Sequence, residues 1–106
     1  MYVIRRVYEV KPGTAKQVAA LVQQQGDAYH NAGQRSEVRV YFNGGTVPGD
    51  IDRVYMEWTD NVIDSPYREG LRLPEEALQI GAQVREHVIK QYIEFFEMMT
   101  PGKMGK

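Results

Sequence analysis

The stretch QYIEFFEMM, residues 91–99, decides which fold this chain of 106 residues adopts. Apolar residues recur at helical intervals through it and just before it, at Val88, Tyr92, Phe95 and Met99. The stretch can therefore prolong a preceding helix. Its aromatic and β-branched residues are equally typical of a strand. Periodicity alone leaves both alternatives open.

Two earlier segments have clearer patterns. Residues 2–10, YVIRRVYEV, predict a strand, because β-branched and aromatic residues run up to a Lys-Pro-Gly break. Residues 15–31 predict a helix, since apolar residues recur there at helical intervals. Thr14 and Gln17 have the spacing of a capping box, and Gly33 suits the position that follows a helix end.

The middle of the chain predicts a hairpin and a second helix. Residues 36–42 and 52–58 alternate between apolar and polar residues and flank the turn-rich NGGTVPGDI, which is typical of an antiparallel hairpin. Residues 60–73 show no regular pattern. Residues 73–90, LPEEALQIGAQVREHVIK, begin with a proline and two glutamates that suit a helix N-terminus, so we expect a helix over this segment.

The order of these elements favours a strand at residues 91–98. Strand, helix, hairpin and helix alone would leave an unpaired sheet edge and a half-covered first strand. A strand antiparallel to residues 2–9 completes βαββαβ, the ferredoxin-like arrangement. We therefore expect an α+β fold with an antiparallel sheet in one domain, residues 1–100, followed by a flexible tail, residues 101–106.

Composition and charge narrow the classes of partner and chemistry. A net charge of -1 gives no support for a nucleic acid or an anionic membrane as partner. No apolar run approaches the roughly 20 residues that span a bilayer, and the first ten residues lack a signal-peptide core. The absence of cysteine excludes disulfides, thiol nucleophiles and iron–sulfur clusters, and His30 and His87 lack metal-binding spacing. We expect a cytoplasmic protein without metal or cofactor.

The tripeptide Arg-Val-Tyr occurs three times, beginning at residues 6, 39 and 53. Residues i and i+2 share a face of a strand, so each copy sends Arg and Tyr to one face and Val to the other. The face expected under the helices carries Val3, Arg5, Val7, Val38, Val40, Phe42, Val54, Met56, Trp58, Ile93 and Phe95. The opposite face is expected to carry Tyr2, Ile4, Arg6, Tyr8, Arg39, Tyr41, Arg53, Tyr55, Glu57, Tyr92, Glu94 and Phe96.

This second face is too aromatic for plain solvent and too charged for a dry core. A large exposed aromatic patch on a small protein indicates an interaction surface. The simplest cover is the same face of a second copy, so we expect a homodimer.

Two segments resemble a known family. IRRVYEVKPG, residues 4–13, resembles the opening of NIPSNAP-type proteins, in which an Arg-x-Tyr strand runs into Lys-Pro-Gly. The residues on that pattern are Arg6, Tyr8, Lys11, Pro12 and Gly13. DIDRVYMEW, residues 50–58, is similar to a later strand of that family, which follows an acidic turn and ends near a tryptophan.

Size and element order also resemble the wider dimeric α+β barrel superfamily, which includes the antibiotic-biosynthesis monooxygenases. The resemblance implies that two sheets join face to face as a dimeric α+β barrel. It also implies a ligand pocket, either between sheet and helices or inside the barrel. Members of the superfamily include cofactor-free oxygenases, haem-degrading enzymes, isomerases and proteins of no known activity.

The candidate ligand-binding residues are Arg6, Tyr8, Tyr41, Arg53, Tyr55, Glu57 and His87. An arginine beside a tyrosine can lower the pKa of the phenol, and together they can hold an oxyanion on a carbonyl or phenolic compound. We expect Arg6 and Arg53 to converge, because they lie on neighbouring strands. In the alternative, these residues only join two subunits through cross-strand Arg–Glu pairs. His87 either packs at the core edge or faces the pocket as a general base or haem ligand.

Two classes of function remain open. The first is binding of a small aromatic or anionic compound, with cofactor-free chemistry on an aromatic or carbonyl group, monooxygenase- or isomerase-like. The second is a non-catalytic, NIPSNAP-like interaction or structural protein. A pocket lined by titratable groups favours the first, and a barrel filled by its own side chains favours the second.

Overall fold

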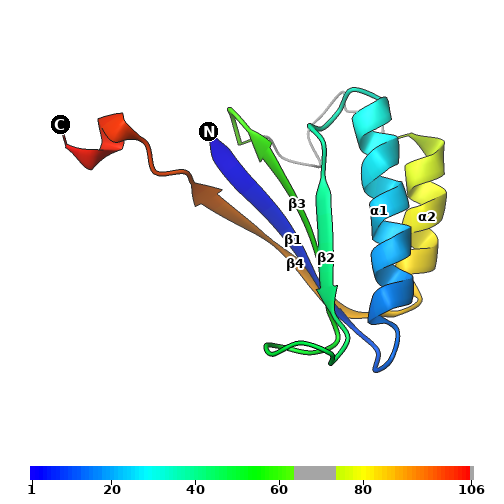
Figure 1. The fold of residues 1–106 in the computed structure, drawn as a ribbon. Coiled ribbons are helices and arrows are strands. Elements are labelled where there is room, and N and C mark those ends of the chain that lie inside the picture. The colour runs from blue at the N-terminus through cyan, green and yellow to red at the C-terminus, as the bar shows by residue number, and fades with distance from the viewer. Residues whose placement is uncertain (64–73, 106) are drawn as a thin grey trace.

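A computed structural model describes residues 1–63 and 74–105 of the chain (Figure 1). The elements in chain order are β1 (Tyr2–Val10), α1 (Ala15–Asn31), β2 (Arg39–Asn43), β3 (Arg53–Asp60), α2 (Glu75–Arg85), β4 (Val88–Glu97) and the short 3₁₀ helix η1 (Pro101–Met104). The strands form one antiparallel sheet in the order β2-β3-β1-β4. This is the ferredoxin-like α+β fold that the sequence predicts.

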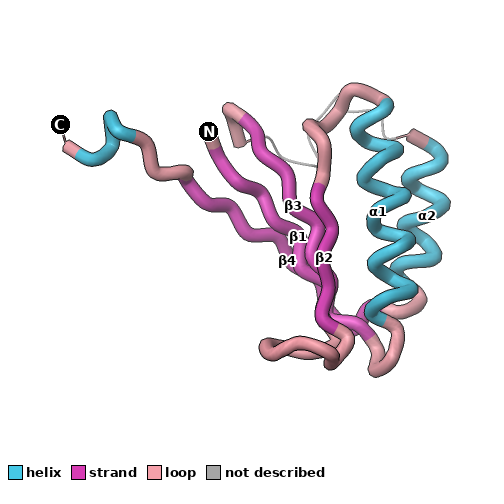
Figure 2. Tube along the Cα trace, in the orientation of Figure 1, coloured by secondary structure: helices cyan, strands magenta, loops and turns pink. Residues whose placement is uncertain are grey.

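The two helices lie side by side on one face of the sheet, here called the helix side (Figures 1 and 2). No helix or strand of the described chain covers the other face, here called the open face. The core fills the helix side, where Val18 and Val22 of α1 cluster with Val54 and Met56 of β3. The molecule therefore has two layers.

The stretch that decides the fold is a strand. β4 pairs antiparallel with β1, and residues 91–98 largely fall within it, so the helical alternative is wrong. β4 begins earlier than expected, at Val88, and α2 ends at Arg85 rather than continuing to Lys90. His87 consequently lies in the turn between them, where its carbonyl oxygen accepts a hydrogen bond of 2.9 Å from the Lys11 amide. Pairing with β1 outweighs the helical periodicity of this segment.

The prediction for the faces of β1 is wrong. The register places Ile4 opposite Trp58, Arg6 opposite Met56 and Tyr8 opposite Val54. Partners across antiparallel strands share a face, so these β1 residues lie on the helix side. Ile4 and Tyr8 indeed belong to the core cluster. Residues 3, 5 and 7 lie on the open face, opposite Thr59, Glu57 and Tyr55.

The predicted faces of β2, β3 and β4 agree with the register. Val54, Met56 and Trp58 are buried on the helix side, and Val40 packs against them. Phe42 and Phe95 share that side with their partners in the register, but they are exposed. They lie on the two edge strands, which the helices leave partly uncovered.

The connections differ in detail from the expected ones. The Thr14 hydroxyl donates to the Lys11 carbonyl oxygen at 2.6 Å, and no side-chain cap is made, so the capping box with Gln17 does not form. Gly33 follows α1 with φ 74°, as its position predicts. Residues 64–73, within the segment expected to be irregular, lie outside the described residues. Residues 101–104 form η1, and the flexibility of the tail stays a prediction.

Candidate functional site

The structure distributes the candidate site residues over three places. Arg6 and Tyr8 lie on the helix side, His87 lies in the turn before β4, and four candidates lie on the open face: Tyr41, Arg53, Tyr55 and Glu57. Arg6 and Arg53 therefore do not converge. The Arg53 guanidinium instead lies 3.5 Å from the Glu9 carboxylate and donates to the Ile51 carbonyl oxygen at 3.0 Å.

A pocket of about 170 Å³ lies on the helix side, between the sheet and the two helices. Its polar lining comes from β1, α1, α2, β4 and the segment after α1, and consists of Arg6, Tyr8, Gln25, Tyr29, Arg35, Arg85 and Gln91. The described lining thus contains three arginines and no acidic side chain or histidine. The arginines of this lining can donate hydrogen bonds to an anion. His87 does not belong to this lining.

Gly81 of α2 allows the two helices to approach each other beside the pocket. A Cβ atom at Gly81 would lie 3.0 Å from Gln25 Nε2 and 3.5 Å from Arg85 Nη1. Gln25 Nε2 also donates to the Ala77 carbonyl oxygen at 3.4 Å. Small residues at one face of α2 therefore bring polar side chains of both helices to the pocket.

Arg35 lies between two aromatic rings. Its guanidinium carbon is 3.9 Å from the centre of the Tyr29 ring and 4.2 Å from that of Trp58. Its Nη1 donates to the Met56 sulfur at 3.4 Å. A planar cation over an aromatic face is attracted by the ring quadrupole, so both contacts hold the guanidinium in place. The sequence pattern missed Arg35, because it lies in a connection where no periodicity assigns a face.

Arg6 carries a buried donor atom. Its neighbours across the strands are Met56 on β3 and Ile93 on β4. The Nε atom of Arg6 is buried and has no hydrogen-bond acceptor among the described residues. An unsatisfied buried donor costs about 1–3 kcal/mol, more when the group is charged. An acceptor group of a ligand would remove that cost.

Tyr8 supplies a phenol that keeps its proton. The side chain is 2% exposed, and burial raises its pKa to about 12, although the charges of Arg6 and Arg35 act in the opposite direction. The charges of Arg6 and Arg35 lower the pKa of Tyr8, as expected for an arginine beside a phenol, but desolvation of the phenolate exceeds their attraction. At neutral pH Tyr8 is therefore a neutral hydrogen-bond donor and not a base.

The open face carries a separate network around Arg5. Arg5 donates through Nε and Nη2 to Glu94 Oε1, at 3.1 and 3.0 Å. Its guanidinium carbon lies 5.4 Å from the ring centre of Tyr55 and 5.3 Å from that of Phe96. Arg5 was expected on the face under the helices, yet it lies on the open face of β1, between β3 and β4.

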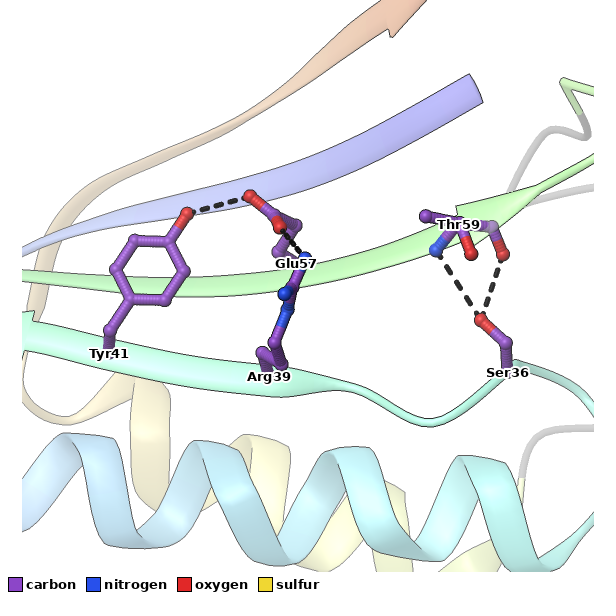
Figure 3. A network of polar contacts seen from close by, with 5 residues as sticks. All are labelled: Ser36, Arg39, Tyr41, Glu57 and Thr59. Carbon is purple, nitrogen blue, oxygen red and sulfur yellow. Dashed lines mark hydrogen bonds and ion pairs between the residues drawn. The ribbon is translucent and has the colours of Figure 1, made fainter. Parts of the chain in front are cut away.

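Glu57 extends this network to β2 (Figure 3). The Tyr41 hydroxyl donates to Glu57 Oε1 at 2.9 Å, and Arg39 Nη2 lies 2.6 Å from Glu57 Oε2. The rings of Tyr41 and Tyr55 stack with their centres 5.1 Å apart. Burial raises the pKa of Tyr41, with Arg5 acting against that shift and Glu57 with it. Charged groups of the open face thus pair with one another, as in a contact surface.

Residues 1–63 and 74–105 contain neither a metal-binding cluster nor a membrane-spanning helix. In the described ranges, no three side chains of His, Asp or Glu gather as a metal ion would require. Of the helices described, none is both long enough and apolar enough to cross a bilayer.

Solved structures with the same fold include NIPSNAP proteins. A NIPSNAP domain protein from Burkholderia xenovorans is 17% identical, with a TM-score of 0.67 over 95% of this chain and 97% of its own. A NIPSNAP family protein from Agrobacterium tumefaciens is 17% identical, with a TM-score of 0.70 over 94% of each chain. A protein of unknown function from Bacteroides fragilis, described as dimeric and ferredoxin-like, is 16% identical, with a TM-score of 0.58 over 92% of this chain and 96% of its own.

The sequence comparisons give no match, either to a protein-family model or to a curated protein. The structural likeness extends over nearly the whole chain, so it includes the elements beyond residue 60, where the resemblance in sequence ends. The chain therefore has the ferredoxin-like fold of solved NIPSNAP domain proteins, as its Arg-x-Tyr strand and Lys-Pro-Gly turn imply.

Proposed function

We propose that this protein binds a small anionic compound in the helix-side pocket. The observation that carries the proposal is the lining itself, in which Arg6 and Arg85 lie together with the phenol of Tyr8. The buried Nε of Arg6 adds a donor that lacks an acceptor. A charge-assisted hydrogen bond at such a place contributes roughly 1.5–3 kcal/mol.

Tyr8 limits the chemistry that the pocket supports. A protonated phenol beside two guanidinium groups can donate to a carboxylate, or to an oxyanion that develops on a carbonyl or phenolic group. A monooxygenase- or isomerase-like activity on an aromatic or carbonyl compound is therefore the second candidate. The described lining holds no histidine or carboxylate to accept a proton. Binding is accordingly the function that the geometry supports best.

We also propose that two copies associate through their open faces. Tyr41, Tyr92 and Phe96 are each about two fifths exposed there, which is a large aromatic area for a protein of this size. The arginines and glutamates of the same face are paired within the chain, so a second copy could cover them without leaving an unpaired charge. One structural neighbour is described as dimeric. If the protein is instead a non-catalytic, NIPSNAP-like interaction protein, the open face is also the surface through which it would bind its partner.

Trp58 provides a direct test of the pocket. It is the single tryptophan of the chain and lies against Arg35, so its fluorescence should respond when an anion binds. We expect benzoate to change the emission in a saturable way. Arg6→Met should weaken binding by about tenfold or more, the equivalent of at least 1.4 kcal/mol.

The matched control is Arg39→Met, which removes an arginine from the open face. This variant should bind benzoate as the wild type does. The proposal is wrong if no small carboxylate changes either the Trp58 emission or the melting temperature of the wild type. It is equally wrong if both arginine variants weaken binding to the same extent.

A further inference from the structure

Two walls of the helix-side pocket differ in chemistry. The wall from the sheet is polar, with Arg6 and Tyr8 of β1 and Gln91 of β4. The wall from α2 is apolar apart from Arg85 and consists of Ala77, Leu78, Gly81 and Val84. An inorganic anion would use the arginines and Tyr8 and would leave Ala77, Leu78 and Val84 in contact with water.

The volume of the pocket limits the size of its occupant. The pocket measures about 170 Å³. An apolar cavity of about 150 Å³ accepts benzene, so this pocket has room for one ring or a short branched chain. Because the pocket is partly open, a second fused ring would extend from it toward solvent.

We infer that the occupant is an amphipathic monocarboxylate of about the size of benzoate, held with its carboxylate against Arg6 and Tyr8 and its apolar body against α2. This inference rests on the proposed function and adds the orientation and size class of the ligand. The planar guanidinium of Arg6 matches the planar geometry of a carboxylate. Tyr8 donates a further hydrogen bond as a neutral phenol.

Gly81 makes the orientation testable, because it lies on the apolar wall. A Cβ atom there would meet only the ends of two flexible side chains, Gln25 at 3.0 Å and Arg85 at 3.5 Å. Gly81→Ala is therefore compatible with the fold, and alanine is the better helix former. The substitution narrows the space for the ligand body and leaves Arg6 and Tyr8 in place.

The experiment titrates acetate, benzoate and 2-naphthoate into the wild type, Gly81→Ala and Arg6→Met, with calorimetry and Trp58 emission as readouts. The wild type should bind benzoate at least tenfold more tightly than acetate and should bind 2-naphthoate no more tightly than benzoate. Gly81→Ala should lower the affinity for benzoate about fivefold or more and leave the affinity for acetate unchanged. Arg6→Met should lower the affinity for both acetate and benzoate. Thermal melts of each variant establish that it is folded.

The outcomes separate this inference from the proposed function. If acetate binds as tightly as benzoate, or Gly81→Ala weakens both acids equally, the body does not lie against α2 and the inference is overturned, while anion binding stands. If inorganic phosphate binds more tightly than benzoate, the inference that the occupant is a monocarboxylate is likewise overturned. If no anion binds the folded wild type, the proposed function itself fails.

Discussion

Arg6 of β1 lies opposite Met56 of β3, and this pairing directs the arginine to the helix side of the sheet. The other two Arg-Val-Tyr copies behave differently, since Tyr41 and Tyr55 are paired and stacked on the open face. One tripeptide thus serves two surfaces. In β1 it lines a pocket, and in β2 and β3 it lies on the open face, where we propose that a second copy binds.

Gly26 of α1 should not tolerate alanine. A Cβ atom there would overlap Val38 Cγ2, where α1 approaches the chain before β2. Overpacking of this kind costs about 1–3 kcal/mol, which exceeds the roughly 1 kcal/mol that alanine gains in a helix. We expect Gly26→Ala to lower the free energy of unfolding, measured by urea denaturation. In a chain that already carries Val38→Ala, the same Gly26→Ala substitution should cost less, because the overlapping Cγ2 atom is gone. If the free-energy changes of the two single variants simply add in the double variant, the contact between Gly26 and Val38 is contradicted.

Tyr8 should make stability depend on pH in the alkaline range. An unfolded tyrosine has a pKa of about 10, whereas the pKa of buried Tyr8 is raised to about 12. Because the folded state keeps a proton that the unfolded state loses, this contribution is constant below about pH 10 and falls as the pH rises toward 12. The loss is on the order of 2–3 kcal/mol. Urea midpoints of the wild type and Tyr8→Phe should diverge only above about pH 10, and parallel curves would refute the shift.

The ring contacts of Arg35 should need a guanidinium. Arg35→Lys keeps the charge but loses the planar stack on Tyr29 and Trp58, each contact contributing roughly 0.5–2 kcal/mol. A drop of several degrees in melting temperature is expected for a domain of this size. Arg39→Lys is the control, since its side chain is 74% exposed and such pairs contribute at most about 1 kcal/mol. Equal drops in the two variants would argue against the stack.

Phe95 and Phe96 test the open-face dimer, because they are adjacent, similarly exposed and on opposite faces of β4. Sedimentation of the wild type should give about twice the 12.2 kDa of one chain. Phe96→Asp places a charge in the proposed interface and should yield monomers. Phe95→Asp, on the helix side, should leave the mass unchanged. A monomeric wild type, or dissociation by Phe95→Asp alone, would rule out this interface.

Local signals determined much of the fold. The predicted bounds of β1 and α1 match the structure, because Lys-Pro-Gly ends the strand and Gly33 follows the helix in a left-handed conformation. The end of α2 was misplaced because residues 86–90 suit either element. Pairing with β1, which is distant in sequence, makes residues 88–90 part of a strand.

The site was less predictable, for two physical reasons. Both faces of β1 carry apolar residues, so its own pattern does not fix which side is buried, and a shift of one residue exchanges the faces. In the structure, Ile4 lies opposite Trp58, and this pairing sets which face of β1 is turned toward the helices. Arg35 is positioned by ring contacts with Tyr29 and Trp58, which no local pattern encodes. The sequence therefore identified Arg6 and Tyr8 as candidates but placed them on the wrong face.

Amide chemical shifts of ¹⁵N-labelled protein during a benzoate titration test most directly whether the ligand site lies on the helix side. The pocket predicts saturable shifts centred on Arg6, Tyr8 and Gly81, with the Trp58 indole also responding. Tyr41 and Tyr55, on the open face, should change little. Shifts centred on Tyr41 and Tyr55, with Arg6 and Gly81 unaffected, would contradict the account.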